Sequence, residues 1–188
     1  MPNSFPPLPL HDTPTVYGRI SRLGHWAGAL MVLSLLGLGL VFEELPRGGL
    51  RVLLRQSHIT LGVLCLLPLL ARVLWRLQAV RSGHSPQPIS AGGWKLHAER
   101  GVHLLLLATL LLLLATGPLS IWADGDAIHL FGQFDLPSPI PPSYTLQRVC
   151  GVVHALGSKL LIGLLALHLL GVVRHGRKAW QRMAGQIE

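Results

Sequence analysis

Four long apolar segments run along the chain, separated by short stretches that hold most of the proline and charged residues. The segments cover residues 20–42, 52–77, 97–121 and 149–173. Each is long enough to cross a bilayer, because a helical span needs about 20 apolar residues. A helix also satisfies its own backbone hydrogen bonds in lipid. The pattern therefore predicts an all-α integral membrane protein, a four-helix bundle in which successive helices run up and down.

The remaining residues are too few for a separate soluble domain. Residues 1–18 contain five prolines, which prevent a regular helix and predict a loose N-terminal arm. Residues 19–178 are expected to form the transmembrane domain, and residues 179–188 a short tail. The first apolar segment ends in Phe42-Glu43-Glu44-Leu45-Pro46 and lacks the small-residue cleavage site of a secretory signal. We expect it to remain as a membrane span.

The basic residues predict the orientation of the helices. The net charge is +8, but Lys and Arg flank the apolar segments instead of forming one stripe or tail, which argues against a nucleic-acid partner. Eleven of the 16 Lys and Arg lie in the arm, the second connection and the tail, and four lie in the first and third connections. Because basic residues favour the cytoplasmic side, both termini are predicted to be cytoplasmic.

Four histidines lie within the apolar segments, where an ionisable side chain is costly and usually functional. They are His25, His58, His154 and His168. The last two are fourteen residues apart, which on a helix places them on nearly one face and about 21 Å apart along the axis. With the predicted topology, His25 and His168 share the cytoplasmic level, and His58 and His154 share the outer level.

Two histidine pairs at two depths suit bis-histidine haem iron, because a helical bundle can hold a flat macrocycle between facing helices. A single histidine in a membrane is more often a hydrogen-bond partner of a neighbouring helix, so the pairing by depth is what favours haem. Zinc fits less well, since no carboxylate or cysteine cluster completes a tetrahedral site. Cys65 and Cys150 are expected to be free thiols, and no Cys-x-x-Cys-His motif for covalent haem is present.

A glycine follows each of these histidines by about one helical turn. Such a glycine lets a porphyrin approach the backbone, or lets two helices pack closely, and the sequence leaves both interpretations open. The four are Gly28, Gly62, Gly157 and Gly171.

Together these features resemble the bacterial cytochrome b561 family of four-helix, di-haem inner-membrane proteins, which includes superoxide oxidase and the b-type subunits of some hydrogenases. The resemblance covers about residues 17–178. It implies two non-covalent haem b groups, one held by His25 and His168 and one by His58 and His154. It rests on Arg22-Leu23-Gly24-His25-Trp26, His58-Ile59-Thr60-Leu61-Gly62, Arg72-Val73-Leu74-Trp75-Arg76, His103 leading to Gly117-Pro118, Phe131-Gly132, Pro137, and His154 to His168.

Two basic residues inside the spans are candidates for contacts with haem. Arg72, fourteen residues after His58, returns to nearly the same helix face at the depth of the cytoplasmic haem. We expect it to pair with a haem propionate, with a topology charge that reaches the lipid surface as the alternative. Lys159 is expected to face the bundle, an outer propionate or an outer surface that attracts anions.

The other histidines have weaker assignments. His103 and His175 match positions where the family often has a histidine that is not an axial ligand. His175 is a candidate for contact with a quinone, and an interfacial histidine is the alternative. Three more are expected to be ordinary surface residues: His11, His84 and His129.

The resemblance implies electron transfer across a bacterial inner membrane, with superoxide:ubiquinone oxidoreduction as the leading activity. The alternative is a haem-bearing anchor or electron-carrier subunit of a periplasmic dehydrogenase or hydrogenase. A remote alternative is a haem-free transporter with a histidine proton relay. The expected partners are membrane lipid, a quinone, and superoxide or a periplasmic redox protein. The sequence leaves open whether the chain is an oxidoreductase or a pure carrier, and whether it forms a homodimer.

Overall fold

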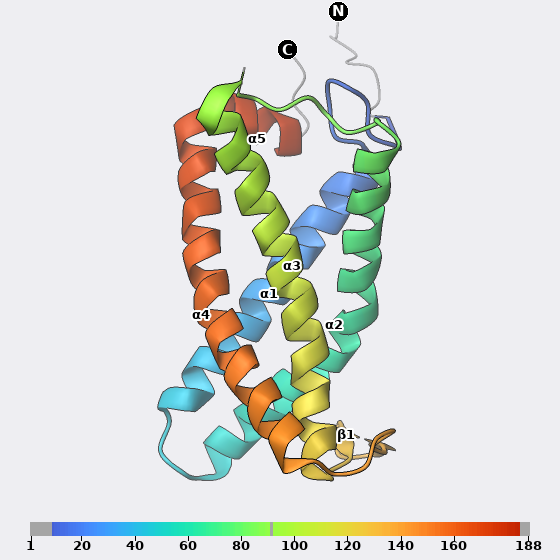
Figure 1. Ribbon diagram of the computed structural model, residues 1–188, viewed down its shortest axis with the longest axis vertical. Helices are drawn as coiled ribbons and strands as arrows, with labels where there is room; N and C mark the ends of the chain where they lie inside the picture. Colours follow the sequence, from blue (N-terminus) through green and yellow to red (C-terminus); the bar gives the residue numbers. More distant parts are fainter. Residues whose placement is uncertain (1–8, 91, 185–188) are drawn as a thin grey trace, which may run out of the picture.

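The computed structural model describes residues 9–90 and 92–184. Its long helices are α1 (Arg19–Glu44), α2 (Gly49–Arg81), α3 (Gly93–Asp124) and α4 (Tyr144–His175), and all four are long and apolar enough to cross a membrane. They alternate in direction, so that the start of α1 and the end of α4 lie at the same end of the bundle (Figure 1). We call this the terminal end. The predicted all-α four-helix membrane bundle is confirmed.

The helices continue beyond the apolar segments. α2 begins three residues before the predicted start at 52 and ends at Arg81, and α3 begins at Gly93. α4 begins five residues early, because the Ser143 hydroxyl accepts a hydrogen bond from the Leu146 N–H and caps the helix. Polar and basic residues therefore belong to the same helices as the membrane spans and extend them beyond the apolar region.

A small β-hairpin, which the sequence did not predict, joins α3 to α4. Its strands, β1 (Ile128–Leu130) and β2 (Phe134–Leu136), are antiparallel. Phe131 and Gly132 in the turn both have positive φ angles, of 53° and 67°, as a tight reversal between strands requires. We call this end of the molecule, at the bottom of Figure 1, the hairpin end.

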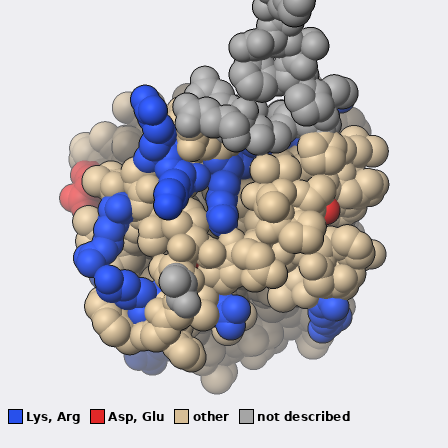
Figure 2. All heavy atoms as spheres, turned by 90° about the horizontal axis from the view of Figure 1, so that it is seen from above, with Lys and Arg blue, Asp and Glu red and all other residues tan. Residues whose placement is uncertain are grey.

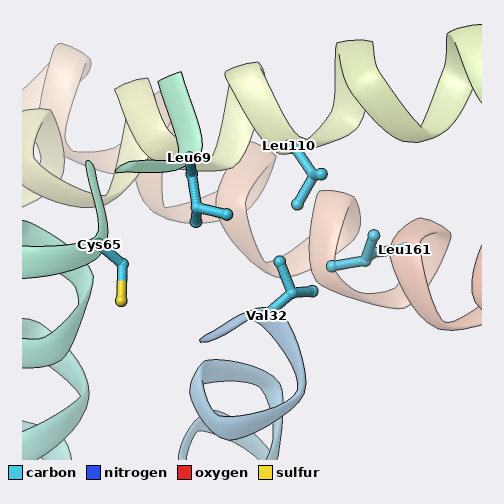
Figure 3. Packing of buried hydrophobic residues seen from close by; sticks show 5 residues of the cluster. All are labelled: Val32, Cys65, Leu69, Leu110 and Leu161. Carbon is cyan, nitrogen blue, oxygen red and sulfur yellow. The ribbon is translucent and has the colours of Figure 1, made fainter. Parts of the chain in front are cut away.

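The bundle is built from two helix pairs, since α1 packs mainly on α2 and α3 mainly on α4. All four helices meet in one small apolar cluster (Figure 3). On α4 the cluster residue Leu161 lies seven positions from both His154 and His168. An apolar layer therefore separates the two histidine levels. Its buried members are Val32, Cys65, Leu69, Leu110 and Leu161.

Residues 9–18 contain no helix but are docked against the terminal end. Asp12 is buried, and its carboxylate accepts a hydrogen bond of 2.8 Å from the Gly18 N–H. The His11 ring stacks on Trp75 of α2 with 5.6 Å between ring centroids. The arm expected over residues 1–18 and the tail expected over 179–188 lie partly outside the described residues.

A short fifth helix, α5 (Arg177–Ala184), follows α4 directly. The buried Arg22 of α1 donates from Nη2 to the carbonyls of Arg182 and Gln181, at 2.9 and 3.2 Å. A guanidinium thus meets the carbonyl end of α5, where the helix dipole is negative. This contact holds α5 against the start of α1.

Candidate functional site

At the hairpin end, the structure brings together His58 from α2 and His154 from α4. Their ring centroids are 6.3 Å apart, and the ring planes are nearly perpendicular, at 85°. Both side chains are half-buried inside the bundle. We call these residues the hairpin-end pair.

Hydrogen bonds fix the tautomer of both imidazoles in this pair. His58 Nδ1 lies 2.9 Å from the carbonyl oxygen of Leu35, which can only accept, so Nδ1 carries the proton. His154 Nδ1 lies 3.1 Å from the Thr116 hydroxyl, whose own proton is donated to the carbonyl of Leu112 at 2.8 Å. The hydroxyl therefore accepts from His154. In both rings Nε2 keeps its lone pair free, as a metal-binding histidine requires.

Two glycines from neighbouring helices lie against these rings. A Cβ atom at Gly39 of α1 would lie 3.5 Å from Cε1 of His58, and one at Gly117 of α3 would lie 3.3 Å from Cε1 of His154. Each glycine faces a histidine on a neighbouring helix. Spacing along one helix does not reveal such a contact, so the sequence carried no signal for this pairing.

The glycines that follow the histidines along the same helix have other neighbours. A Cβ at Gly28 would lie 2.7 Å from Cδ of Arg72, and one at Gly157 would lie 3.1 Å from a methyl carbon of Leu113. Gly62 is near Leu35, and no neighbouring atom lies within 4 Å of a Cβ at Gly171. At Gly28 and Gly157 the structure favours close packing of neighbouring side chains.

At the terminal end, His25 from α1 and His168 from α4 form the second pair. Their ring centroids are again 6.3 Å apart, with 54° between the ring planes. His103 from α3 lies close by, with its ring 5.2 Å from that of His168, and its Nδ1 is 2.6 Å from the carbonyl of Glu99. We call His25 and His168 the terminal-end pair, and His103 is its third neighbouring imidazole.

Arg72 reaches the terminal-end pair from α2. Its Nη2 donates to Nδ1 of His25 over 3.0 Å, and its aliphatic stem lies against Gly28. A histidine that binds a metal through Nε2 in its neutral form has its proton on Nδ1, where it cannot accept a hydrogen bond. Metal binding by His25 through Nε2 would therefore require the guanidinium to turn to another acceptor.

Both pairs have the separation that one iron ion between two imidazoles requires. A bond from a metal to an imidazole nitrogen is about 2 Å long, and each ring nitrogen lies about 1 Å from its ring centre, so two such ligands have centroids about 6 Å apart. Within the described ranges, no group of three or more His, Cys, Asp or Glu is placed to hold a metal ion by itself. Each pair could therefore supply two imidazole nitrogens to one iron ion, with the remaining bonds to the iron supplied by a macrocycle such as haem.

Lys159 is exposed and does not face the bundle, which was one of the three environments predicted for it; contact with an outer propionate or a place on an outer surface that attracts anions stays a prediction. It lies five residues after His154, which rotates it by about 140° around the helix axis. The buried residues of α4 include Gly157 and Leu161, and Lys159 lies on the opposite, exposed face. The angle of Lys159 around the axis of α4 follows from residue spacing, so the sequence alone could have placed this side chain away from the bundle.

His175 lies at the rim of the terminal end, at the end of α4. Together with Lys95 and Arg174 it lines an open hollow of about 630 Å³. Seen from this end, Lys and Arg side chains gather on the surface, and few acidic side chains are visible (Figure 2). The helical rise places His175 about 10 Å beyond His168, so it lies apart from the terminal-end pair.

The residues expected to be peripheral are placed as follows. His129 lies in the hairpin and pairs with Asp135 at 2.6 Å. His84 lies after the end of α2 and is exposed. Cys65 and Cys150 are both buried and free, as predicted.

Comparisons with known proteins agree with this geometry. The family model described as "Prokaryotic cytochrome b561" matches residues 16–186. A relative, "Cytochrome b561 homolog 2" of Escherichia coli (strain K12), is 30% identical over 165 residues, which cover 87% of this chain and 86% of the relative. The matched region contains both histidine pairs and all four spans. The chain therefore belongs to the prokaryotic cytochrome b561 family, and it is a multi-pass bacterial membrane cytochrome that binds haem b and carries electrons.

Proposed function

We propose that the protein holds two haem b groups and passes electrons across the inner membrane, from superoxide at the hairpin end to ubiquinone at the terminal end. The observation that supports it most strongly is the pair of equal separations. Two imidazole pairs, each 6.3 Å apart, lie at two levels of one bundle. The hairpin-end pair would hold one haem and the terminal-end pair the other.

The residues of the chain have separate tasks in this proposal. Bound haem supplies a one-electron redox centre at each level. The Leu35 carbonyl and the Thr116 hydroxyl orient the hairpin-end imidazoles and fix their tautomers. The apolar layer around Leu161 excludes water and ions between the two levels. Electrons can then cross the bundle while ions cannot.

The orientation in the membrane is part of the proposal. Exposed basic residues gather at the terminal end, which therefore faces the cytoplasm by the positive-inside rule (Figure 2). Both described ends of the chain lie on that side. The hairpin then faces the periplasm.

The hairpin end has basic residues that would attract an anionic donor. Arg47, Arg55 and Arg148 are exposed, whereas Arg51 donates to the carbonyl of Leu45 at 2.7 Å within the turn between α1 and α2. Positive charge around a site concentrates anions and raises their rate of arrival. Two superoxide anions would each give up one electron and leave as O₂.

The acceptor would take up these electrons at the terminal end. Ubiquinone would accept two electrons and two protons from the cytoplasmic side to become ubiquinol. His175 and the hollow beside it lie at the water boundary of that end, and a histidine there can pass protons near neutral pH. This supports His175 as a residue that serves quinone protonation.

Haem counting tests the first half of the proposal. The purified protein should give a reduced-minus-oxidised spectrum of b-type haem, and extraction should give two haems per chain. A preparation without haem would support the transporter alternative, and one haem per chain would overturn the two-site assignment.

Mixing with superoxide tests the second half. The two-haem protein should be reduced by superoxide and reoxidised by a soluble ubiquinone analogue. Haem that stays oxidised in superoxide, together with co-purification of a soluble redox protein, would show instead that the chain is the membrane anchor of a periplasmic dehydrogenase or hydrogenase.

A further inference from the structure

The two histidine pairs have the same separation but different charged neighbours. The guanidinium of Arg72 is hydrogen-bonded to Nδ1 of His25, and the ring of His25 lies 6.3 Å from that of His168, so one positive charge lies beside both rings. The third imidazole at this level, His103, has its Nδ1 against a backbone carbonyl. The described residues include no carboxylate in an ion pair with Arg72. The terminal-end pair thus lies in direct contact with a guanidinium that forms no ion pair within the described residues.

The hairpin-end pair differs in its direct contacts: within the part of the chain that the structure describes, no guanidinium or ammonium is hydrogen-bonded to its rings, and the arginines of this end lie at the surface. Both of its rings donate from Nδ1 to neutral oxygen acceptors. Glu43 lies four residues after Gly39 on α1, so its carboxylate is on nearly the same helix face as the glycine that lies against His58. Glu43 is exposed, so solvent weakens its effect, but its sign is negative.

The packing of Arg72 fixes the position of its charge. The side chain is half-buried, and its stem passes over Gly28, where a Cβ would lie 2.7 Å from Cδ and 3.1 Å from Nε. A Cβ at Gly24, one turn earlier on α1, would also lie 3.9 Å from this stem. The two glycines provide the space through which a long cationic side chain reaches the terminal-end pair.

The charges and hydrogen bonds around each pair would shift the reduction potential of a bound iron ion in a known direction. Reduction of ferric to ferrous iron adds a negative charge, which a nearby cation stabilises, and the effect is large where water is excluded. A histidine ligand that donates a hydrogen bond from its other nitrogen becomes a stronger base and favours the ferric state. A nearby carboxylate favours the ferric state as well.

We infer that Arg72 holds the reduction potential of the terminal-end haem above that of the hairpin-end haem. This inference rests on the proposed two-haem function and adds the residue that orders the two sites. With both haems bound, Arg72 would favour the arrival of one electron at the group held by His25 and His168 as that electron leaves the group held by His58 and His154. One electron would move and no bond would break, so transfer from the periplasmic to the cytoplasmic side would be downhill.

The difference between the two reduction potentials would depend on the charge of Arg72 and not on its hydrogen bond to His25. When His25 binds iron through Nε2, the guanidinium turns to another acceptor, for example a haem propionate. Its stem still lies against Gly28, so the charge stays beside the same pair. Neutralising a propionate also favours the ferrous state, so the direction of the effect is unchanged.

A redox titration of the purified two-haem protein, followed by the haem absorbance, tests this order. We expect haem reduction in two separate waves, and His168→Ala should remove the wave with the higher midpoint potential. Arg72→Gln should lower the midpoint potential of the high-potential wave and leave the midpoint of the low-potential wave unchanged. Arg72→Lys, which keeps the charge, should leave both midpoints unchanged. Arg76→Gln is the matched control, because Arg76 lies one turn later and binds the Ser85 hydroxyl at 2.5 Å.

Glu43→Gln tests the hairpin-end pair. It should raise the midpoint potential of the low-potential wave and leave the high-potential wave unchanged. If Arg72→Gln cannot retain its haem, Arg72→Met, which also removes the charge but keeps an unbranched stem, is titrated by the same criteria. Two waves that Arg72→Gln leaves unmoved, or loss of the lower wave in His168→Ala, would overturn the inference while the two-haem function stands. Fewer than two haems in the parent protein would overturn the proposed function itself.

Discussion

At the scale of single residues, hydrogen-bond partners decide which ring nitrogen of His58 and of His154 carries the proton. His58 and His154 each donate a hydrogen bond from Nδ1 to an oxygen atom that can only accept it. Thr116 is the more informative partner, since its proton is already used on Leu112. The side chain can only accept from His154.

Replacing Thr116 by Val should weaken the hairpin-end haem alone. The valine has the same shape but leaves His154 Nδ1 without an acceptor, and loss of such a partner typically costs about 10–100-fold in metal affinity. Faster transfer of one haem to apomyoglobin would show this. Thr109→Val is the matched control, because Thr109 is equally buried on α3. Equal haem loss from both variants would contradict the role of Thr116.

The pairing of the four histidines was predictable from the sequence, because depth follows from helical rise and from the charge of the connections. The contacts around the rings were not. Gly39 and Gly117 face histidines on other helices, and the rotation of one helix against another is set by packing of the whole bundle. Lys159 is a different case, since its angle on α4 was available from the sequence.

At the scale of secondary-structure elements, the membrane spans were predictable and their ends were not. Apolar length defines where lipid begins, but α4 starts at a serine cap and α2 ends in a polar stretch. The hairpin and α5 are short and lack a strong hydrophobic repeat. They are formed by contacts with the bundle, so the local sequence gave little indication of them.

Arg22→Ala should release α5 from α1. The guanidinium makes hydrogen bonds to two carbonyls of α5, and each hydrogen bond from a charged group contributes about 1.5–3 kcal/mol. Amide hydrogen exchange over residues 177–184 should therefore become faster, while exchange in α2 and α3 stays unchanged. Arg19→Ala, an exposed change at the start of the same helix, provides the control. Unchanged exchange in α5 would show that other contacts hold it.

At the scale of the whole molecule, the proposed electron transfer needs haem at both histidine pairs, because the pairs lie at different depths. Their rings lie on opposite sides of the apolar layer, and each pair takes one member from α4. A chain that binds haem at only one pair would still fold and would still show haem absorbance. It would not connect the two membrane faces.

His58→Ala and His25→Ala should therefore each retain about half of the haem and stop transmembrane electron transfer. The measurement uses proteoliposomes that contain ferricyanide, with dithionite added outside. The parent protein should bleach the enclosed ferricyanide quickly, and both variants should match empty liposomes. Rapid bleaching by either variant would mean that one haem is sufficient.

Because α4 carries one histidine of each pair, its length between His154 and His168 sets the distance between the two pairs. Inserting one residue there would turn the lower part of the helix by about 100° and carry one imidazole away from its partner. Seven inserted residues would nearly restore the angle but would lengthen the gap by about 10 Å. The spacing can therefore change only in large steps, and the protein cannot be adjusted gradually to a thicker membrane by lengthening this helix between its ligands.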